Sequence, residues 1–401
     1  MDLDMFLKES PGALVPITGT DPMRGAWEHR AFVPDALPET MPPLSPETFL
    51  AVANARAAIA ALDSTASRLP EPGLLRSPTL RREAQSTSAL EGTYAPLEQV
   101  LTADEEDPST AEMTEILNYV RMAETGFYRV AQGWPLSVSV VAELQGILMR
   151  GTPLEEESGR LRAGQVVIGL RSDVPLDDVP VRTARFVPSP PGADLEVRLR
   201  DLIDWMQRDH GQRIDPIVAA AMAHYQFETL HPFRDGNGRI GRYLIVLHLL
   251  AAGVLSEPTL TVSPWFEARR AAYYDHLLGV SARADWDSFI RFFAEGVRSA
   301  ADGTRKQMVA LVDVQSRLHD LVRESSLRSG RANELIDFAV SHLTFTVRMV
   351  ESALGISYGR ANTLVGQLVD LGVLAVVDPD AYKRRFFAPQ VLQVLTSRTV
   401  A

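Results

Sequence analysis

Residues 217–252 read IVAAAMAHYQFETLHPFRDGNGRIGRYLIVLHLLAA, and this stretch decides the fold. Apolar residues recur at helical spacing on both sides of a polar, glycine-rich centre. Pro232 disfavours helical geometry at the residue before it, so the first helix is expected to end near His231. A second helix is expected to begin near Gly238. The stretch therefore predicts two buried helices joined by a tight loop.

The loop concentrates groups that bind phosphate and move protons. Residues 236–238 (Gly-Asn-Gly) can adopt positive φ, so their N–H groups can converge on an anion at the N-terminus of the next helix. Arg239 and Arg242 are three residues apart and can share one helix face. Asp235 offers a carboxylate suited to Mg²⁺ bridging phosphates, and His231 can act as a base. Together they predict a phosphoryl- or nucleotidyl-transfer site.

Two other motifs overlap this segment, and neither fits. Residues 236–241 match the dinucleotide-binding pattern G-x-G-x-x-G, but a helix rather than a strand precedes them. Glu228 and His231 form a Glu-x-x-His pair, as in di-iron helix bundles, but that site needs a second copy. No other histidine follows a carboxylate by three residues.

The rest of the chain has mainly helical periodicity, so the fold class is mainly α. The first 44 residues are proline-rich and are expected to form an extended arm. A short irregular β-hairpin is expected between 165–169 and 185–187. A helix–turn–helix followed by a hairpin in the last 70 residues predicts a winged helix–turn–helix. Further helices are expected at about 45–62, 77–90, 109–131, 137–149, 195–206, 289–297 and 304–322.

Composition excludes several protein classes. The chain has 401 residues, no cysteine and a formal net charge of −11. The missing cysteines exclude disulfides, thiolate nucleophiles and cysteine-ligated metal centres. The acidic balance disfavours a chain that wraps nucleic acid. We expect a cytoplasmic protein, because the sequence shows no signal peptide and no apolar run long enough for a membrane span.

The segment from His231 to Arg242 resembles the motif of the Fic family, His-Pro-Phe-x-Asp/Glu-Gly-Asn-Gly-Arg-x-x-Arg, at every fixed position. The resemblance implies a mainly α Fic-type helical bundle with a small β-hairpin flap. It also implies a protein adenylyltransferase, which moves AMP from ATP to a Ser, Thr or Tyr hydroxyl of a protein, including itself. Mg²⁺ would be the cofactor, and some relatives also remove AMP.

The resemblance assigns roles to individual residues. His231 would be the general base, and Asp235 would hold Mg²⁺. The flap that docks the target segment would include Val166, Val167, Ile168 and Gly169. ATP and its phosphates would be bound by Asp235, Gly236, Asn237, Gly238, Arg239, Ile240, Gly241, Arg242 and Tyr273.

A second resemblance is regulatory. Thr87-x-x-x-Glu91-Gly92 matches the family's inhibitory motif Ser/Thr-x-x-x-Glu-Gly/Asn. Thr87 and Glu91 would share one helix face. In the family this glutamate pairs with the second arginine of the motif, here Arg242, and blocks productive ATP binding. The resemblance thus places the chain in the class with an N-terminal inhibitory helix and a C-terminal winged helix.

These features predict four parts: an arm and inhibitory helical domain (1–110), a Fic catalytic domain (111–300), a connecting helix (301–330) and a winged helix (331–401). Partners would be ATP and a protein substrate, and could include a second copy of the chain. DNA binding is not favoured, because residues 357–371 carry Arg360 as their single basic side chain. Two alternatives stay open. One is a Fic enzyme that transfers another group, such as UMP, and the other is a transcriptional regulator that senses nucleotide.

Overall fold

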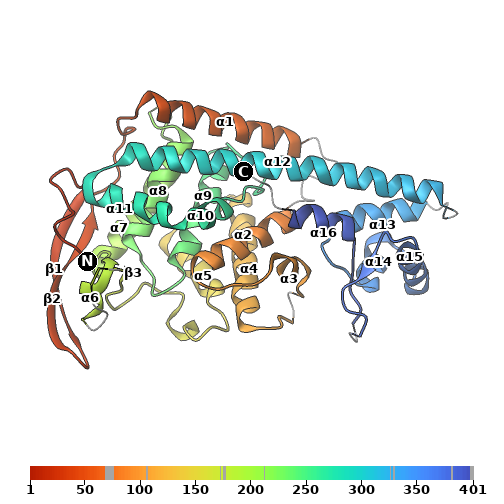
Figure 1. Ribbon diagram of the computed structural model, residues 1–401, viewed down its shortest axis with the longest axis horizontal. Helices are drawn as coiled ribbons and strands as arrows, with labels where there is room; N and C mark the ends of the chain where they lie inside the picture. The colour runs from red at the N-terminus through yellow and green to blue at the C-terminus, as the bar shows by residue number, and fades with distance from the viewer. Residues whose placement is uncertain are drawn as a thin grey trace. The chain divides into compact units, whose positions relative to one another are not determined.

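The computed structural model describes the chain except for residues 68–75, 105–106, 172, 175–177, 212, 326, 328–329, 381–382 and 398–401. Within the described part the fold is mainly α, with sixteen α-helices and three two-stranded antiparallel sheets (Figure 1). None of these helices is long and apolar enough to cross a membrane. The predicted fold class is confirmed at this level.

Helices make up most of the described part of the chain. They are α1 (Pro46–Ala66), α2 (Arg76–Leu90), α3 (Leu97–Thr102), α4 (Ala111–Ala131), α5 (Val138–Leu148), α6 (Pro180–Thr183), α7 (Ala193–Met206), α8 (Pro216–Leu230), α9 (Asn237–Ala251), α10 (Ser263–Ala268), α11 (Arg270–Arg283), α12 (Trp286–Glu324), α13 (Gly330–Ser341), α14 (Val347–Leu354), α15 (Tyr358–Asp370) and α16 (Pro389–Thr396).

The chain folds into two compact units. Unit 1 contains Met1–Ala57, Asn118–Ser256 and Trp265–Arg298, and unit 2 contains Ala58–Leu117, Glu257–Pro264 and Ser299–Ala401. Each unit is assembled from segments far apart in sequence. The four-part division expected from the sequence stays a prediction.

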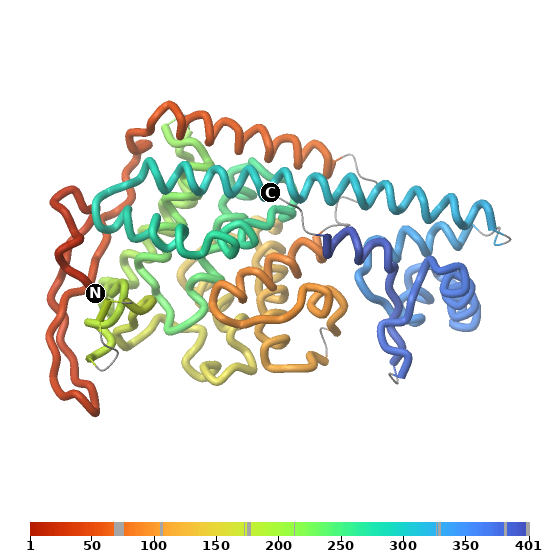
Figure 2. Tube along the Cα trace, in the orientation of Figure 1, coloured from red at the N-terminus to blue at the C-terminus, as the bar shows by residue number. Residues whose placement is uncertain are grey.

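The N-terminal segment is not simply an extended arm. Strands β1 (Gly12–Asp21) and β2 (Gly25–Pro34) form a ten-residue antiparallel hairpin (Figure 2). The Asp21 side chain accepts hydrogen bonds from the N–H groups of Met23 and Arg24, both at 2.9 Å, and Gly25 has a φ of 81°. This turn chemistry reverses the chain. The prolines from 34 onward lie at the end of β2 and after it, where they do not interrupt pairing.

Two helical patterns that the sequence analysis treats as separate, at 289–297 and 304–322, form the single 39-residue helix α12. No proline interrupts the segment between them. The helices α13, α14 and α15 follow in unit 2, and β5 (Ala375–Val376) pairs with β6 (Phe386–Phe387) before α16. Residues 381–382 and 398–401 of the predicted winged helix lie outside the described part.

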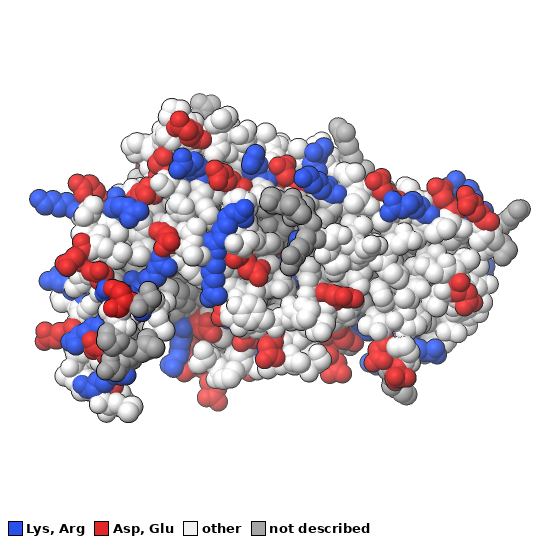
Figure 3. All heavy atoms as spheres, in the orientation of Figure 1, with Lys and Arg blue, Asp and Glu red and all other residues white. Residues whose placement is uncertain are grey.

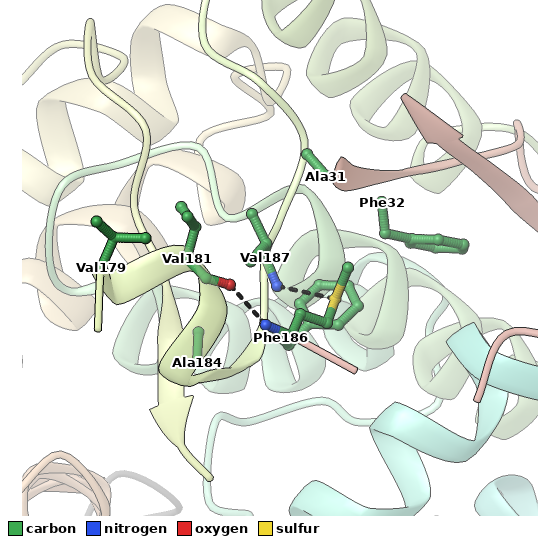
Figure 4. Packing of buried hydrophobic residues seen from close by; sticks show 8 residues of the cluster. Ala31, Phe32, Val179, Val181, Ala184, Phe186 and Val187 are labelled. Carbon is green, nitrogen blue, oxygen red and sulfur yellow. Dashed lines mark hydrogen bonds between the residues drawn. The ribbon is translucent and has the colours of Figure 1, made fainter. Parts of the chain in front are cut away.

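The predicted hairpin in unit 1 forms between β3 (Ile168–Leu170) and β4 (Ala184–Phe186). Its connection includes residues 172 and 175–177, which are not described. An apolar cluster joins this hairpin to β2, and Figure 4 shows Val179, Val181, Ala184, Phe186 and Val187 beside Ala31 and Phe32. Phe32 N–H donates to the Val187 carbonyl oxygen at 2.9 Å, so the two hairpins are also linked through the backbone.

Charged side chains of both signs are interspersed on the face shown in Figure 3.

Candidate functional site

The loop between α8 and α9 has the conformation that its sequence predicts at both ends. His231 ends α8 in the left-handed region, with φ 50° and ψ 60°, and its N–H donates to the Phe227 carbonyl at 3.0 Å. Gly236 precedes α9 with φ 81°. Gly238, in contrast, is helical and has no positive φ, because α9 already begins at Asn237.

The Asn237 side chain holds the loop together through hydrogen bonds to the backbone of Phe233. Its Oδ1 accepts the Phe233 N–H at 2.8 Å, and its Nδ2 donates to the Phe233 carbonyl at 2.9 Å. Both residues are buried, with 1% and 0% exposure. The side chain that the sequence analysis expects at a phosphate is therefore engaged with the loop's own backbone. Phe233 anchors the loop in the core.

The N-terminus of α9 provides a concentration of positive charge. The first N–H groups of a helix lack intrahelical partners and carry the positive end of the helix dipole. Arg239 and Arg242 lie in the first two turns and are only 2% and 1% exposed. Arg239 Nη2 lies 3.5 Å from Asp235 Oδ1, and the Asp235 side chain is 43% exposed. The arrangement can bind an anion at the helix end.

Arg242 lies beside a buried group of aromatic and polar side chains. His224 Nε2 is 2.7 Å from the Tyr273 hydroxyl, and its Nδ1 is 3.9 Å from Glu228 Oε1. Burial, reinforced by the nearby Arg242 charge, lowers the pKa of His224 to about 3, so the ring is neutral at pH 7. Burial also raises the pKa of Tyr273 well above its usual value. Tyr273 is fully buried, with its hydroxyl turned to His224 rather than to solvent.

The remaining motif residues pack tightly behind the loop. Ile240 is fully buried. A Cβ on Gly241 would lie 2.2 Å from Glu228 Oε1, and one on Gly236 would lie 2.9 Å from a methyl carbon of Leu148. The glycines thus permit close packing against α8 and α5.

His231 has an orientation that suits a base. Its Nδ1 lies 3.3 Å from the Glu228 carbonyl oxygen. A carbonyl can only accept, so the hydrogen bond places the proton of the neutral ring on Nδ1. The lone pair then belongs to Nε2, which is the atom able to take a proton.

Arg162 is a site residue that sequence reasoning missed. Its guanidinium donates from Nε to the His231 carbonyl at 2.7 Å, from Nη1 to the Gly164 carbonyl at 3.1 Å, and from Nη2 to the carbonyls of Ser189 and Leu230. It is 6% exposed, and burial lowers its pKa to about 10, so it stays charged at neutral pH. This one side chain ties the end of α8 to both chain segments at the base of the β3–β4 hairpin.

Gln145 of α5 is a second missed residue. Its Nε2 donates to the Asp235 carbonyl at 3.1 Å, and its Oε1 accepts the Gly159 N–H at 2.7 Å. An isolated glutamine or arginine in sequence carries no signal of such a role, because its partners are backbone atoms of distant residues.

The predicted flap residues lie on and beside β3. Val166, Val167 and Ile168 are half-buried, and Gly169 is exposed with φ 62°. Leu170, which follows them, is 64% exposed. The hairpin is held at its base by Arg162, which donates to the carbonyls of Gly164 and Ser189.

The predicted inhibitory residues belong to unit 2. Thr87 is buried in α2, and Glu91 follows the last residue of that helix. Gly92 follows the helix with φ 98°, a conformation that favours glycine after a helix end. Since Arg242 belongs to unit 1, the expected pairing of Glu91 with Arg242 stays a prediction.

A bound metal would rely on few protein ligands. Among the described residues, no cluster of three or more His, Asp or Glu side chains is arranged to hold a metal ion. Asp235 therefore offers a single carboxylate, which fits an ion whose other ligands are phosphate oxygens and water.

The α8–α9 loop and the buried pair Arg239 and Arg242 lie inside a segment that matches a known family. Residues 135–249 match the Fic/DOC family, and residues 49–128 match the Fic/DOC family N-terminal domain. Over these two segments the chain is similar to Fic/DOC family proteins, and it is distantly related to Fic protein adenylyltransferases.

Curated relatives agree with this assignment. The chain is 33% identical over 161 residues to protein adenylyltransferase fic-1 of Caenorhabditis elegans, a match that covers 40% of this chain and 27% of the relative. It is 27% identical over 199 residues to protein adenylyltransferase Fic of Drosophila sechellia, covering 50% and 35%. The matches thus span about a third or less of these relatives.

The crystal structure of a Fic family protein from Desulfovibrio desulfuricans has a similar fold, with a TM-score of 0.55 and 24% identity. The similarity covers 87% of this chain and 98% of that one.

Proposed function

We propose that the protein transfers AMP from ATP to a hydroxyl group of a protein, and that its activity is autoinhibited. The observation that carries the proposal is the α8–α9 loop, in which His231 lies at one end and the anion-binding terminus of α9 at the other. The naming of distant relatives as protein adenylyltransferases supports the same reaction.

In this proposal His231 acts on the acceptor hydroxyl. Its Nε2 takes the hydroxyl proton as the oxygen attacks the α-phosphorus of ATP. A bond forms between that oxygen and phosphorus, and the bond to the bridging oxygen of the β-phosphate breaks. Pyrophosphate leaves. The Nδ1 contact with the Glu228 carbonyl and the Arg162 bond to the His231 carbonyl hold the ring and its backbone in place.

The phosphates would lie at the N-terminus of α9. The backbone of 236–238 would face the α-phosphate, with Arg239 and Arg242 binding the outer phosphates. Their guanidinium groups provide charge-assisted hydrogen bonds that are strong in a buried environment. Asp235 would hold Mg²⁺, which, when bound, neutralises phosphate charge. Val166 to Gly169 would align the target segment by strand-like pairing along β3.

Glu91 would restrain the enzyme by pairing with Arg242, so that the outermost phosphate loses a partner and ATP binds with poor alignment for attack. The C-terminal helices α13 to α15 and the β5–β6 hairpin support a winged helix–turn–helix assignment for 331–401. We assign protein contact or self-association to it, because α15 carries Arg360 as its single basic residue.

The first test replaces the base. His231→Ala should lower transfer of labelled AMP by about 10²–10⁴-fold while ATP binding persists, because the imidazole is not needed to hold phosphate. His319→Ala, on α12, is the matched control and should leave transfer unchanged. Mass spectrometry of the modified proteins identifies the transferred group, so UMP in place of AMP would overturn the proposed donor.

The second test addresses autoinhibition. Glu91→Gly should raise self-modification well above that of the original chain, and Glu91→Asp should raise it less. Adding Arg242→Ala to Glu91→Gly should remove the gain. Glu98→Gly, in α3, provides the control for the chemical change. Equal activity of Glu91→Gly and the original chain would leave the transferase proposal standing and overturn the inhibitory one.

A further inference from the structure

Unit 2 contains a cavity of about 820 Å³ that is remote in sequence from the Fic motif and is lined mostly by polar and charged residues. Its walls come from the start of α2, Asp104, the segment from the end of α13 to the N-terminal end of α14, the N-terminal end of α15, and the strand β6 with the residues before it. All of these segments belong to the same compact unit. A cavity of this volume lies in the range of small-molecule binding sites.

The cavity gathers positive charge from three separate segments. Its cationic lining residues are Arg81, Arg348, Lys383, Arg384 and Arg385. Adjacent basic residues in a hairpin, such as 383–385, are ordinarily a solvated face. Here two arginines from elements far apart in the chain face the same cavity. Like charges brought together repel each other, and a bound anion relieves that repulsion.

Few negative charges offset this cluster. Asp104 is the single carboxylate among the described lining residues, and its Oδ2 lies 2.8 Å from Arg385 Nη1. Arg348 pairs with Glu351 of its own helix at 3.1 Å. Lys383 and Arg384 are exposed and have no carboxylate partner within the described part of the chain. Lys383 and Arg384 can therefore bind an external anion without first breaking an ion pair.

The cavity also offers groups that recognise more than charge. Thr346 caps α14 by accepting the Met349 N–H at 3.3 Å. Residues 346–349 line the cavity, so the positive end of the α14 dipole forms part of its wall. Tyr358 is 45% exposed, with the Arg348 guanidinium 4.9 Å from its ring centre, and Asn362 lies one turn further along α15. An aromatic ring and an amide suit a planar heterocycle beside the phosphates.

We propose that this cavity binds a nucleotide-sized ligand that carries two or more phosphate groups. The site is distinct from the α9 terminus, since none of the residues from 231 to 242 lines it. The proposal does not depend on the transferase reaction, and its test needs no activity measurement.

The test compares two double variants of the full chain. Lys383→Ala with Arg384→Ala removes the two unpaired cations. Lys306→Ala with Arg317→Ala removes two exposed cations of α12 in the same unit and changes the net charge equally. Inorganic tripolyphosphate and ADP are the probes, and hydrogen exchange of peptides covering 341–362 and 383–388 reports binding at this cavity separately from binding at the Fic loop.

Both probes should slow exchange in these peptides, and the effect should weaken as salt is added. Lys383→Ala/Arg384→Ala should lower the affinity read from these peptides about tenfold or more, because hydrogen bonds to charged groups are strong. The control pair should stay within about twofold. Absence of protection at saturating probe, or equal loss in both pairs, overturns the proposal. So does a short DNA duplex that protects the same peptides at far lower concentration than either probe, since nucleic acid would then be the occupant.

Discussion

The α8–α9 loop and the basic cavity of unit 2 both collect positive charge, but they achieve it in different ways. In the loop, two arginines lie three residues apart and are almost completely buried. In the cavity, the cations come from segments around 81, 348 and 383, and three of them are exposed. The loop's conformation is held by buried hydrogen bonds, whereas the cavity depends on where separate elements meet. A contiguous motif is therefore visible in sequence, and an assembled cavity is not.

If the loop is held by buried contacts, removing one of them should have a large effect. Asn237→Ala leaves the Phe233 N–H and carbonyl without their partner, and should lower the free energy of unfolding by about 3 kcal/mol. Urea denaturation measures the change. Asn54→Ala, at an exposed position of α1, is the control and should stay within about 0.5 kcal/mol. A change at Asn237 as small as that of the control would contradict the contrast between buried loop and surface.

Two glycine substitutions, one in the loop and one in unit 2, should change stability by a smaller amount than Asn237→Ala. Gly236→Ala should destabilise by about 2 kcal/mol, because the residue has φ 81° and its new Cβ would lie 2.9 Å from Leu148. Gly366→Ala is the matched change inside α15, where no atom outside the neighbouring turns of the helix lies within 4 Å of the new Cβ. It should stabilise by about 0.5–1 kcal/mol. Thermal unfolding of both variants checks the opposite signs.

Acidification should act on unit 1 through its buried histidines. Burial lowers the pKa of His224 to about 3 and that of His248 to about 4, against an ordinary value of 6.5. Above pH 6.5 both rings are neutral in the folded and unfolded chain. As the pH falls from 6.5 towards 4, the unfolded chain binds protons that the folded chain excludes, so stability declines.

Each of these histidines should contribute a loss of up to about 1.4 kcal/mol per pH unit in that range. Urea denaturation at several pH values measures the slope. His248→Gln should reduce the dependence of the free energy of unfolding on pH by the contribution of one histidine. A slope unchanged by this substitution would mean that other groups cause the acid sensitivity.

Much of the fold could be predicted from periodicity and turn residues. The ends of α8 and α2, the β3–β4 hairpin and the mainly α class follow from Pro232, Gly92 and the β-rich run at 165–169. The β1–β2 hairpin was missed, although Asp21 and Gly25 flank its turn and β-branched or aromatic residues lie on both sides. The prolines near 34–43 favour an extended chain and obscure that signal. Helix α12 was divided because its apolar stripe weakens between 297 and 304.

The placement of His231, Asp235 and Arg239 around one loop was predictable, because these residues are close together in the sequence. It was not predictable where a side chain holds the backbone of another segment, as with Arg162 and Gln145. Tyr273 illustrates the intermediate case. The resemblance predicts that it binds ATP, which stays a prediction, and its complete burial against His224 depends on packing that no local pattern encodes.

The Arg162 contacts have a consequence for how the domain tolerates mutation. All four of its acceptors are main-chain carbonyls, which every amino acid possesses. The residues at Gly164, Ser189 and Leu230 can therefore change without removing the acceptor atoms, whereas no other side chain supplies donors in the same planar fork. In a saturation mutagenesis experiment, the substitutions that break this contact should be almost entirely substitutions of Arg162. An analysis of covarying positions would therefore not detect the contact, even though it joins three segments of the chain.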